Sequence, residues 1–400
     1  MMRGFWSQVA LIAGTSMGAG MLAMPLSLGA NGFIPSCLLM LYVWSIMFGS
    51  ALFILELTVQ LPIGTHLGAM AEHTLGSTGK KLLSLTYLGL LYSLSAAYLS
   101  GLSAWINAGL SPYIQEGIFK QSLSMMFLLG VMVLVCKSRR WGSRLNRYLV
   151  MGLMVSYVVL ISGLISDIHP QWLMQIDTHQ LGACLPILIV AFGFHIVIPS
   201  LRRFGTGNTQ SLTQVLCLGS LLPLLCYVIW QMVILGVIPK SGAQGLQTLR
   251  DLNEPTVALV HALSVHSHSL RISLSAQCFS IFAMATSLIG VTIGLFDFIS
   301  DHEVAQNASS FSIKVMGLTG IPSAIYAVMY PGAFMYALRY GGAFVAILLG
   351  IFPALMVYRL RQNKSIETWS APGGRGLIVW VLLGSILILG FDLMGVSAIA

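Results

Sequence analysis

Charged side chains are scarce in this sequence. Lysine, arginine, aspartate and glutamate make up 8% of its 400 residues, whereas a soluble domain carries about 25%. Hydrophobic residues reach 56%, and the mean hydropathy is +0.86. This proportion of charged residues is too low to cover a surface that faces water. The composition therefore predicts an all-α membrane protein surrounded by a lipid bilayer.

Motifs that mark several other classes of protein are also missing. The sequence has no P-loop motif for ATP and no HExxH motif of zinc proteases. Its six cysteines show neither CxxC nor metal-ligand spacing. We therefore expect no enzyme, no cofactor and no metal site. The net charge of +8 is spread over short loops between apolar runs, which is not the clustered pattern of a nucleic-acid-binding protein.

Apolar runs long enough to cross a bilayer, which takes about 20 residues, occur eleven times. They cover residues 6–30, 34–60, 82–110, 122–137, 148–167, 183–201, 212–238, 271–298, 312–331, 341–358 and 376–397. No linker or stretch of different composition separates them. The sequence therefore predicts eleven transmembrane helices in one domain over residues 1–400.

The lysines and arginines predict the orientation of these helices. With the N-terminus in the cytoplasm, fifteen of the 20 basic residues lie in cytoplasmic segments and five lie in segments on the other side. Membrane proteins show this excess of basic residues on the cytoplasmic side. An odd number of helices then places the C-terminus on the opposite side of the membrane.

The first and sixth runs carry small residues at mid-depth, where a plain anchor would carry leucine and valine. Gly14, Gly18 and Gly20 lie within seven residues of the first run, and the sixth has Gly193 followed by Pro199. Open backbone inside a bilayer costs several kcal/mol for each unpaired group, so it is kept where it lines a cavity. We predict that both helices are broken at these positions.

The two predicted breaks are five helices apart, so the helices that carry them run in opposite directions. Two halves of five helices, residues 6–167 and 183–358, would form an inverted repeat, with residues 376–397 as an extra helix. The ends of half-helices offer N–H groups to a carboxylate and carbonyls to an ammonium group. The alternative is that both glycine clusters are close contacts between packed helices.

Two ionisable residues in the apolar runs are candidates for carrying a proton. His195 lies near the centre of the sixth run, and Glu56 lies toward the inner end of the second. A carboxylate at mid-bilayer costs about 2.5–3.5 kcal/mol, and ionisable groups there are mostly functional. The structural alternatives are a neutral histidine bonded to a carbonyl of the broken helix, and a glutamate that reaches water at its helix end.

Aromatic and hydroxyl side chains provide further candidates for ligand contacts. Phe192 and Phe194 flank the second predicted break, and Tyr98 lies in the third run. Thr286 and Ser287 lie midway along the eighth run, where they bond either a ligand or their own helix backbone. A cavity faced by aromatic rings would suit an aromatic ligand.

Several stretches of the sequence resemble one transporter family. Phe192-Gly193-Phe194-His195, followed by Ile198-Pro199-Ser200, resembles the signature of the hydroxy and aromatic amino acid permeases. Further matching stretches are residues 13–15, 18–25, 55–56, 96–101, 285–287, 294–297 and 330–332. The likeness covers nearly the whole chain. Within the family, the tyrosine-specific permeases form the most similar branch and the tryptophan permeases the next.

This resemblance implies a fold and an activity. The fold is the five-plus-five inverted repeat of the leucine-transporter and amino acid-polyamine-organocation type, with broken first and sixth helices and one extra helix. The activity is proton-coupled import of aromatic amino acids. Tyrosine is the preferred substrate, with tryptophan and phenylalanine next. The location is the inner membrane of a bacterium, with the C-terminus in the periplasm.

The expected substrate site surrounds the two predicted breaks. The carboxylate would bind N–H groups of residues 18–20, and the ammonium group would meet carbonyls of residues 13, 14 and 192. Protonation of Glu56 or His195 would bias the inward- and outward-open states. The expected substrate contacts are Gly14, Thr15, Gly18, Ala19, Gly20, Tyr98, Phe192, Gly193, Phe194, His195, Thr286 and Ser287.

Two alternative functions stay open at this point. Sodium could be the coupling ion instead of the proton, in a sodium-coupled or hydroxy-amino-acid symporter of the same fold. Its oxygen ligands would be the hydroxyl groups of Thr15, Ser16, Thr286 and Ser287. The alternative from another class is an amino acid sensor without transport activity, against which the absence of a soluble output domain argues.

Overall fold

The computed structural model describes residues 2–115, 117–178, 180–204, 208–302, 308–330, 334–363 and 369–397. Within these ranges every regular element is a helix, as the composition predicts. Pro331 and Gly332, which contribute to the resemblance described above, lie outside them.

In the first half of the chain, helices α3 to α6 have the lengths expected for membrane spans, and shorter elements precede and follow them. In chain order the elements are α1 (Met2–Ser16), α2 (Gly20–Leu28), α3 (Phe33–Gln60), α4 (Leu67–Leu110), α5 (Ile118–Lys137), α6 (Arg139–Leu164), the 3-10 turn η1 (Ile165–Asp167) and α7 (Pro170–Leu173).

The second half also begins with a broken helix, which longer helices follow. Its elements are α8 (Leu181–Ala191), the 3-10 turn η2 (His195–Val197), α9 (Ile198–Phe204), α10 (Thr209–Val237), α11 (Leu246–Arg250), α12 (Pro255–Ser267), α13 (Leu270–His302), α14 (Ala308–Met329), α15 (Phe334–Val345), the π-helix η3 (Ala346–Ile351), α16 (Phe352–Asn363) and α17 (Gly374–Ser397).

Nine of the described helices are long and apolar enough to cross a membrane, and the bent pair α1–α2 brings the number to 10 if it counts as one span. The ninth predicted run falls in α14, whose apolar part, Lys314–Met329, is shorter than these spans. The structure therefore supports a multi-pass membrane protein. The number of eleven helices and the inverted repeat stay predictions.

Helix α4 begins well before the predicted run, which starts at residue 82. It begins at Leu67, where the Ala69 amide donates to His66 Nδ1 at 3.3 Å, and it bends at Gly76, whose φ is 78°. A φ in this range suits glycine, which has no Cβ atom. Hydropathy did not reveal the added turns because they carry polar residues such as Glu72 and Lys80.

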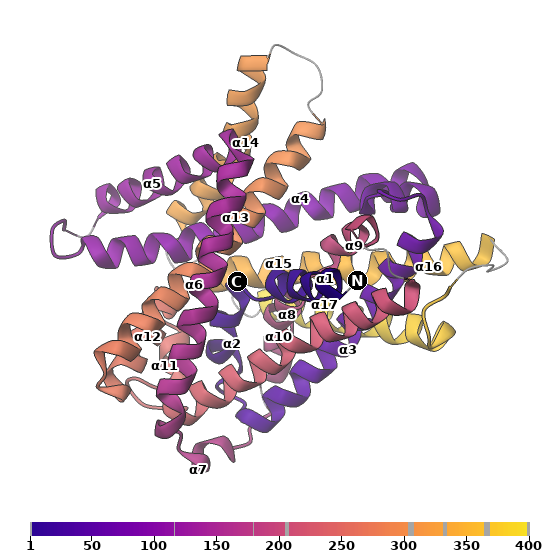
Figure 1. Ribbon diagram of the computed structural model, residues 1–400. Helices are drawn as coiled ribbons and strands as arrows, with labels where there is room; N and C mark the ends of the chain where they lie inside the picture. Colours follow the sequence, from indigo (N-terminus) through magenta and orange to yellow (C-terminus); the bar gives the residue numbers. More distant parts are fainter. Residues whose placement is uncertain are drawn as a thin grey trace.

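Successive helix connections lie at two opposite ends of the molecule. In Figure 1, α7, α11 and α12 lie toward the lower left, and the C-terminal end of α4 and the N-terminal end of α5 lie at the far left, above them. The ends of α4 and α5 line one cavity with the start of α12. The connection from α3 to α4, helix α9 and the C-terminal end of α16 lie toward the right. We call these the α12 end and the α9 end.

Helix α8 lies at the centre of the bundle. It packs against α2, α3, α15 and α17, and Figure 1 shows it near the middle of the molecule. Leu188 and Ile189 have no exposed surface. A helix that is apolar on every side is buried on every side, and this holds the second break at the core.

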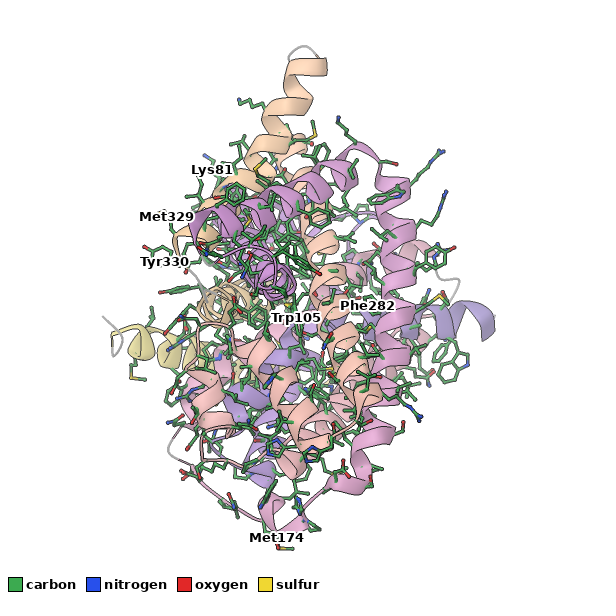
Figure 2. All side chains as sticks on the ribbon, turned by 90° about the vertical axis from the view of Figure 1, so that its left-hand side faces the viewer. Lys81, Trp105, Met174, Phe282, Met329 and Tyr330 are labelled. Carbon is green, nitrogen blue, oxygen red and sulfur yellow. The ribbon has the colours of Figure 1, made fainter. Side chains whose placement is uncertain are left out.

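Two side chains in the middle of Figure 2, Trp105 and Phe282, fasten α13 to its neighbours. The indole N–H of Trp105 on α4 donates to Ser280 Oγ at 3.0 Å. Phe282 lies against Gly152 of α6, where an added Cβ would come within 2.7 Å of the ring. Helix α13 is thus fixed between α4 and α6, just before the turn that carries Ser287.

A buried ion pair fastens the C-terminal helix α17 to α15. Arg339 Nε donates to Asp392 Oδ1 at 3.0 Å, and Arg339 Nη2 donates to the Asp392 carbonyl at 3.2 Å. The two side chains are 14% and 3% exposed. Removing one partner of such a pair costs about 3–5 kcal/mol, because it leaves the other charge buried alone. Helix α17 is therefore an integral part of the bundle.

Candidate functional site

The first predicted break is present in the structure. Helix α1 ends at Ser16, α2 begins at Gly20, and the two are bent by 53°. Residues 17–19 leave the helical path, although the Met17 amide still donates to the Ala13 carbonyl at 3.0 Å and the Met21 amide to the Gly18 carbonyl at 3.0 Å. We call residues 17–19 the first break.

The second predicted break is also present. Helix α8 ends at Ala191, and the 3-10 turn η2 begins at His195. Between them the Gly193 amide donates to the Val190 carbonyl at 3.1 Å, and the Phe194 amide donates to the Phe192 carbonyl at 3.1 Å. We call residues 192–194 the second break. The prediction that the first and sixth helices are interrupted at their glycines is confirmed.

The two breaks meet at one point. A Cβ atom added at Gly20 would lie 3.3 Å from Ala191 Cβ, so only a very small residue lets these two backbones come so close. The hydroxyl oxygen of Tyr227 on α10 lies 2.7 Å from the Ser16 carbonyl and 2.9 Å from the Ala191 carbonyl. One hydroxyl therefore lies between the last carbonyls of both interrupted helices, and its single proton is shared by them or donated to one at a time.

Helix α13 contributes Ser287 to the first break. The Ala19 amide donates to Ser287 Oγ at 3.2 Å, and Ser287 Oγ donates to the Ala283 carbonyl at 2.9 Å. Gly18 leaves the space for this hydroxyl, because an added Cβ would lie 2.5 Å from Ser287 Oγ. The hydroxyl of Tyr98 on α4 lies beside Ser287 as well. The structure thus brings together Gly18, Ala19, Gly20, Tyr98 and Ser287, five of the residues expected to contact substrate.

The two phenylalanines of the second break are fully buried. The Phe192 ring packs edge-on against Tyr227, with centroids 5.4 Å apart and planes at 70°. The Phe194 ring is stacked on His195 at 5.0 Å. Neither ring has exposed surface in this conformation, so they form the packed wall of the break.

His195 is enclosed directly after the second break. Its side chain has no exposed surface, and the polar group beside its ring is the backbone at Met47 of α3. Within the described part of the chain, neither ring nitrogen makes a side-chain hydrogen bond of good geometry. An imidazole held this way keeps its hydrogen-bonding capacity for a proton or ligand that enters the core.

Glu56 is equally buried, but its carboxylate binds partners outside the breaks. Arg361 Nε and Nη2 donate to its two oxygens at 2.9 and 2.6 Å, and the Ala371 amide donates to Oε2 at 2.7 Å. Arg361 also donates to the carbonyls of Ala371 and Gly374. This cluster joins α3, α16 and the segment before α17. The carboxylate therefore does not reach water at a helix end.

The hydroxyls of two predicted contacts bond the backbone of their own helices. The Thr15 hydroxyl donates to the Leu11 carbonyl, and its side chain is exposed. The Thr286 hydroxyl donates to the Ala283 carbonyl at 3.0 Å, which also accepts Ser287. Hydroxyls in helices commonly bond their own backbone in this way. Gly14 lies within α1, with no atom within 4 Å of an added Cβ. The roles of Gly14, Thr15 and Thr286 in substrate binding stay predictions.

Sequence reasoning missed the residues on α10 that support the breaks. Tyr227 lies between the two breaks, and Trp230 Nε1 donates to the Met21 carbonyl at 2.9 Å. The available signal was a tyrosine and a tryptophan three residues apart in a deeply apolar run, because buried rings of these types seek hydrogen-bond acceptors. Arg361 was missed as the partner of Glu56, although both lie near helix ends on the same side.

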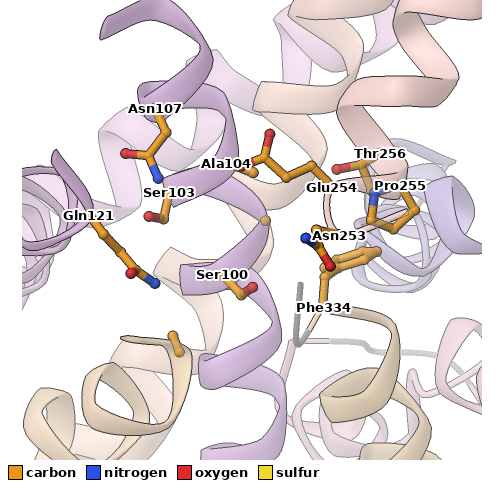
Figure 3. A pocket seen from close by; sticks show the side chains of 12 residues that line it. Ser100, Ser103, Ala104, Asn107, Gln121, Asn253, Glu254, Pro255, Thr256 and Phe334 are labelled. Atoms are coloured by element: carbon orange, nitrogen blue, oxygen red, sulfur yellow. The ribbon is translucent and has the colours of Figure 1, made fainter. Parts of the chain in front are cut away.

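A small polar cavity lies at the α12 end. Its volume is about 30 Å³, which suits a single water molecule. Figure 3 shows Ser100, Ser103 and Asn107 along α4, with Gln121 on one side and Glu254 on the other. Phe334 of α15 also lines this cavity and packs against Gly101.

A much larger cavity lies at the α9 end. Its volume is about 940 Å³. Ile196, Pro199 and Ser200 line it, so it begins directly after the second break. Lys80, with 44% of its side chain exposed, connects it to solvent. The cavity that begins at a break therefore opens toward the α9 end, whereas two further cavities at the α12 end, of about 400 and 780 Å³, include no residue of either break.

Comparisons with known proteins find relatives over nearly the whole length. The model of a family described as the tryptophan/tyrosine permease family matches residues 1–392. The tryptophan-specific transport protein of Pseudomonas aeruginosa is 30% identical over 379 residues, which make up 93% of this chain and 90% of that protein. The tyrosine-specific transport system 1 of Haemophilus influenzae is 30% identical over 381 residues, 94% of either chain.

The low affinity tryptophan permease of Escherichia coli is 26% identical over 394 residues, which make up 96% of this chain and 94% of that protein. Relatives named for tryptophan and for tyrosine thus match to similar extents. Sequence identity alone does not indicate whether the substrate is tryptophan or tyrosine.

The substitution Gly18→Ala tests the contact between α13 and the first break. The added Cβ would lie 2.5 Å from Ser287 Oγ, so the hydroxyl must turn away and release the Ala19 amide. We expect the free energy of unfolding to fall by about 0.5–1.5 kcal/mol, the net value of one hydrogen bond. Thermal unfolding of the purified protein in detergent measures this change.

Gly14→Ala is the matched control, because no atom lies within 4 Å of its Cβ and alanine stabilises a helix interior by about 0.5–1 kcal/mol relative to glycine. In a Ser287→Ala background, Gly18→Ala should have almost no effect. An equal loss in both backgrounds would contradict the contact.

Proposed function

The chain belongs to the tryptophan/tyrosine permease family, and on this premise we propose that it imports aromatic amino acids, tyrosine preferred, by proton symport and alternating access. Relatives named for tryptophan and tyrosine transport support this substrate class. In the proposed topology, eleven helices cross a bacterial inner membrane, with the N-terminus in the cytoplasm and the C-terminus in the periplasm.

The meeting of the two helix breaks is the observation that carries this proposal. Each break ends one half-helix and begins another, so N–H groups and carbonyls of both converge where Gly20 approaches Ala191. A zwitterionic amino acid has one group for each kind of partner: its carboxylate suits the N–H end of a half-helix, and its ammonium group suits the carbonyl end.

Ser287 takes the place of the substrate carboxylate in the proposed mechanism. Its hydroxyl oxygen accepts the Ala19 amide at 3.2 Å, at the start of α2. A carboxylate oxygen is a stronger acceptor than a hydroxyl, so it would displace this contact and leave Ser287 free to donate to the bound carboxylate. The amides of Gly18 and Gly20 would complete this part of the site.

The ammonium group needs carbonyls that are not already used. The Ala13 and Phe192 carbonyls each accept an amide of their own chain segment. The Ser16 and Ala191 carbonyls accept only the shared Tyr227 hydroxyl among the contacts described above. We assign the ammonium group to these last two, each of which has a second lone pair. The ring would pack against Tyr98 and Phe192.

The unequal cavities support alternating access. A chain that binds its substrate at the centre must open to one side at a time. Here a cavity of about 940 Å³ leads from the second break to the α9 end, whereas the cavities at the α12 end, of about 30, 400 and 780 Å³, include no residue of either break. With the proposed topology this arrangement supports an inward-open conformation. The related positions of α1–α2 and α8–α9, five helices apart, support the inverted repeat of the leucine-transporter type.

Glu56 and His195 are the proposed proton-coupling residues. Protonation of Glu56 would weaken its bonds to Arg361 and to the Ala371 amide, and so release α3 from α16 and from the segment before α17. His195, which lies directly after the second break, is the other residue that would take up the transported proton. Loss of one buried, charge-assisted cluster is enough to bias two conformations that differ by a few kcal/mol.

Uptake into proteoliposomes tests the proposed function. The vesicles contain the purified chain and no sodium, and an inward proton gradient of one pH unit is imposed. Each pH unit is worth 1.36 kcal/mol per proton, so one proton per substrate allows about tenfold accumulation of radiolabelled tyrosine. We expect tryptophan and phenylalanine to compete, serine and leucine not to compete, and a protonophore to abolish accumulation.

Accumulation that requires sodium, or competition by serine alone, would favour the sodium-coupled or hydroxy-amino-acid alternative. Saturable tyrosine binding without any net flux would favour a sensor. Uptake of tryptophan alone would change the preferred substrate from tyrosine to tryptophan and leave the rest of the proposal unchanged.

Glu56→Gln tests the proposed coupling. Glutamine keeps the size of the side chain but does not carry the proton-dependent charge that binds Arg361. We expect accumulation driven by the pH gradient to fall to equilibrium, while exchange of internal for external tyrosine continues. The matched control is Asp177→Asn, which removes the charge of a partly exposed ion pair with Lys240 at 2.8 Å. Uphill uptake by Glu56→Gln at the wild-type rate would rule out this role.

A further inference from the structure

The large cavity carries one acidic and two basic side chains that the proposed mechanism does not use. Its lining includes Asp297 from α13, and Lys80 and His66 from the N-terminal part of α4 and the residue before it. The acidic side chain therefore comes from α13 and the basic ones from α4 and the residue before it, and all of them line the same cavity.

The contacts of the basic side chains leave donors for an anion. His66 Nδ1 accepts the Ala69 amide at 3.3 Å, so in the neutral ring the proton lies on Nε2. Lys80 binds Glu72 at 2.7 Å with one of its three N–H bonds, and both side chains are about half exposed, at 44% and 50%. An ammonium group has three donors, and an exposed ion pair contributes about 0–1 kcal/mol, so a bound carboxylate can compete for Lys80.

The same cavity has an aromatic wall. Tyr87 of α4 and Phe298 of α13 pack edge to face, with centroids 5.5 Å apart and planes at 78°. Tyr87 lies close to Asp297, and its hydroxyl would be 3.6 Å from a Cβ at Gly294. Ile196 and Leu348 line the cavity as well. A flat ring thus finds aromatic and aliphatic surfaces next to the charged groups.

This group of residues is distinct from the helix breaks. Asp297 lies ten residues beyond Ser287 on α13, and Tyr87 lies eleven residues before Tyr98 on α4. At 1.5 Å per residue both separations are about 15 Å along the helices. The antiparallel pairs Tyr98 with Ser287, and Tyr87 with Phe298, therefore mark two levels of one passage.

We propose that the large cavity contains a second binding site for a free aromatic amino acid. The ammonium group binds Asp297, the carboxylate binds Lys80 and His66, and the ring lies against Tyr87 and Phe298. This inference rests on the proposed function, because it gives the transported substrate a second place to bind on its way out. Occupancy of this site by internal substrate blocks the passage and slows further uptake.

A phospholipid headgroup that joins an amine to a phosphate has the same pair of charges. The free amino acid is favoured, because the charges and the aromatic wall belong to one cavity that begins at the second break. Phosphoethanolamine therefore serves as the competitor that distinguishes the two sources.

Equilibrium dialysis of the purified full-length chain against radiolabelled tyrosine and tryptophan tests the proposal. We expect two molecules bound per chain at saturation, and one in Asp297→Asn. Gly18→Val, which blocks the first break through its contact with Ser287, should also retain one. The combined variant should bind none. Asp251→Asn, which changes an exposed aspartate directly after α11, is the matched control and should bind two.

A cysteine at Ser84, which lines the cavity, provides a second measurement if a variant folds poorly. In this variant, and with native cysteines that label replaced by serine, tyrosine should slow maleimide labelling of residue 84. The protection should persist when Gly18→Val is added and disappear with Asp297→Asn.

One molecule per wild-type chain with unchanged stoichiometry in Asp297→Asn would overturn the second site and leave the proposed function intact. Displacement by phosphoethanolamine but not by aromatic amino acids would assign the cavity to lipid. Absence of all aromatic amino acid binding by the wild type would instead contradict the proposed function itself.

Discussion

The hydroxyl of Tyr227 is the interaction on which the centre of this protein depends. It lies within hydrogen-bond distance of Ser16 and Ala191, the last residues of two interrupted helices. Inside a bilayer an unpaired carbonyl costs several kcal/mol, so two breaks at one place need a donor that both can reach. Tyr227 supplies it from α10, and Trp230 adds a second donor to the Met21 carbonyl. The open backbone is thereby supported from one helix.

The buried charges follow the same rule of local compensation. Glu56 binds Arg361, and Asp392 binds Arg339, so each of these carboxylates has a guanidinium partner in the core. Both arginines come from the continuous helix formed by α15, η3 and α16. One pair reaches α17 and the other reaches α3. A change in the charge of Glu56 would therefore alter how this long helix is held, at a distance from the breaks.

The positions of both breaks could be predicted from the sequence, because glycines and polar residues at mid-depth are visible without any knowledge of packing. Their convergence on α10 could not, since Tyr227 is 211 residues from Ser16 and only the fold brings them together. The partner of Glu56 is 305 residues away for the same reason. Thr15 and Thr286 were predicted contacts, but the choice between a ligand and the local backbone is made by side-chain rotation. Sequence composition does not determine that choice.

The most direct test of this account is a structure of the chain with bound tyrosine. The account predicts a ligand carboxylate within hydrogen-bond distance of the Ala19 and Gly20 amides, an ammonium group at the Ser16 and Ala191 carbonyls, and a Ser287 hydroxyl that now faces the ligand. A tyrosine bound only elsewhere, with Ser287 still on the Ala19 amide, would contradict the claim that the two breaks form the substrate site.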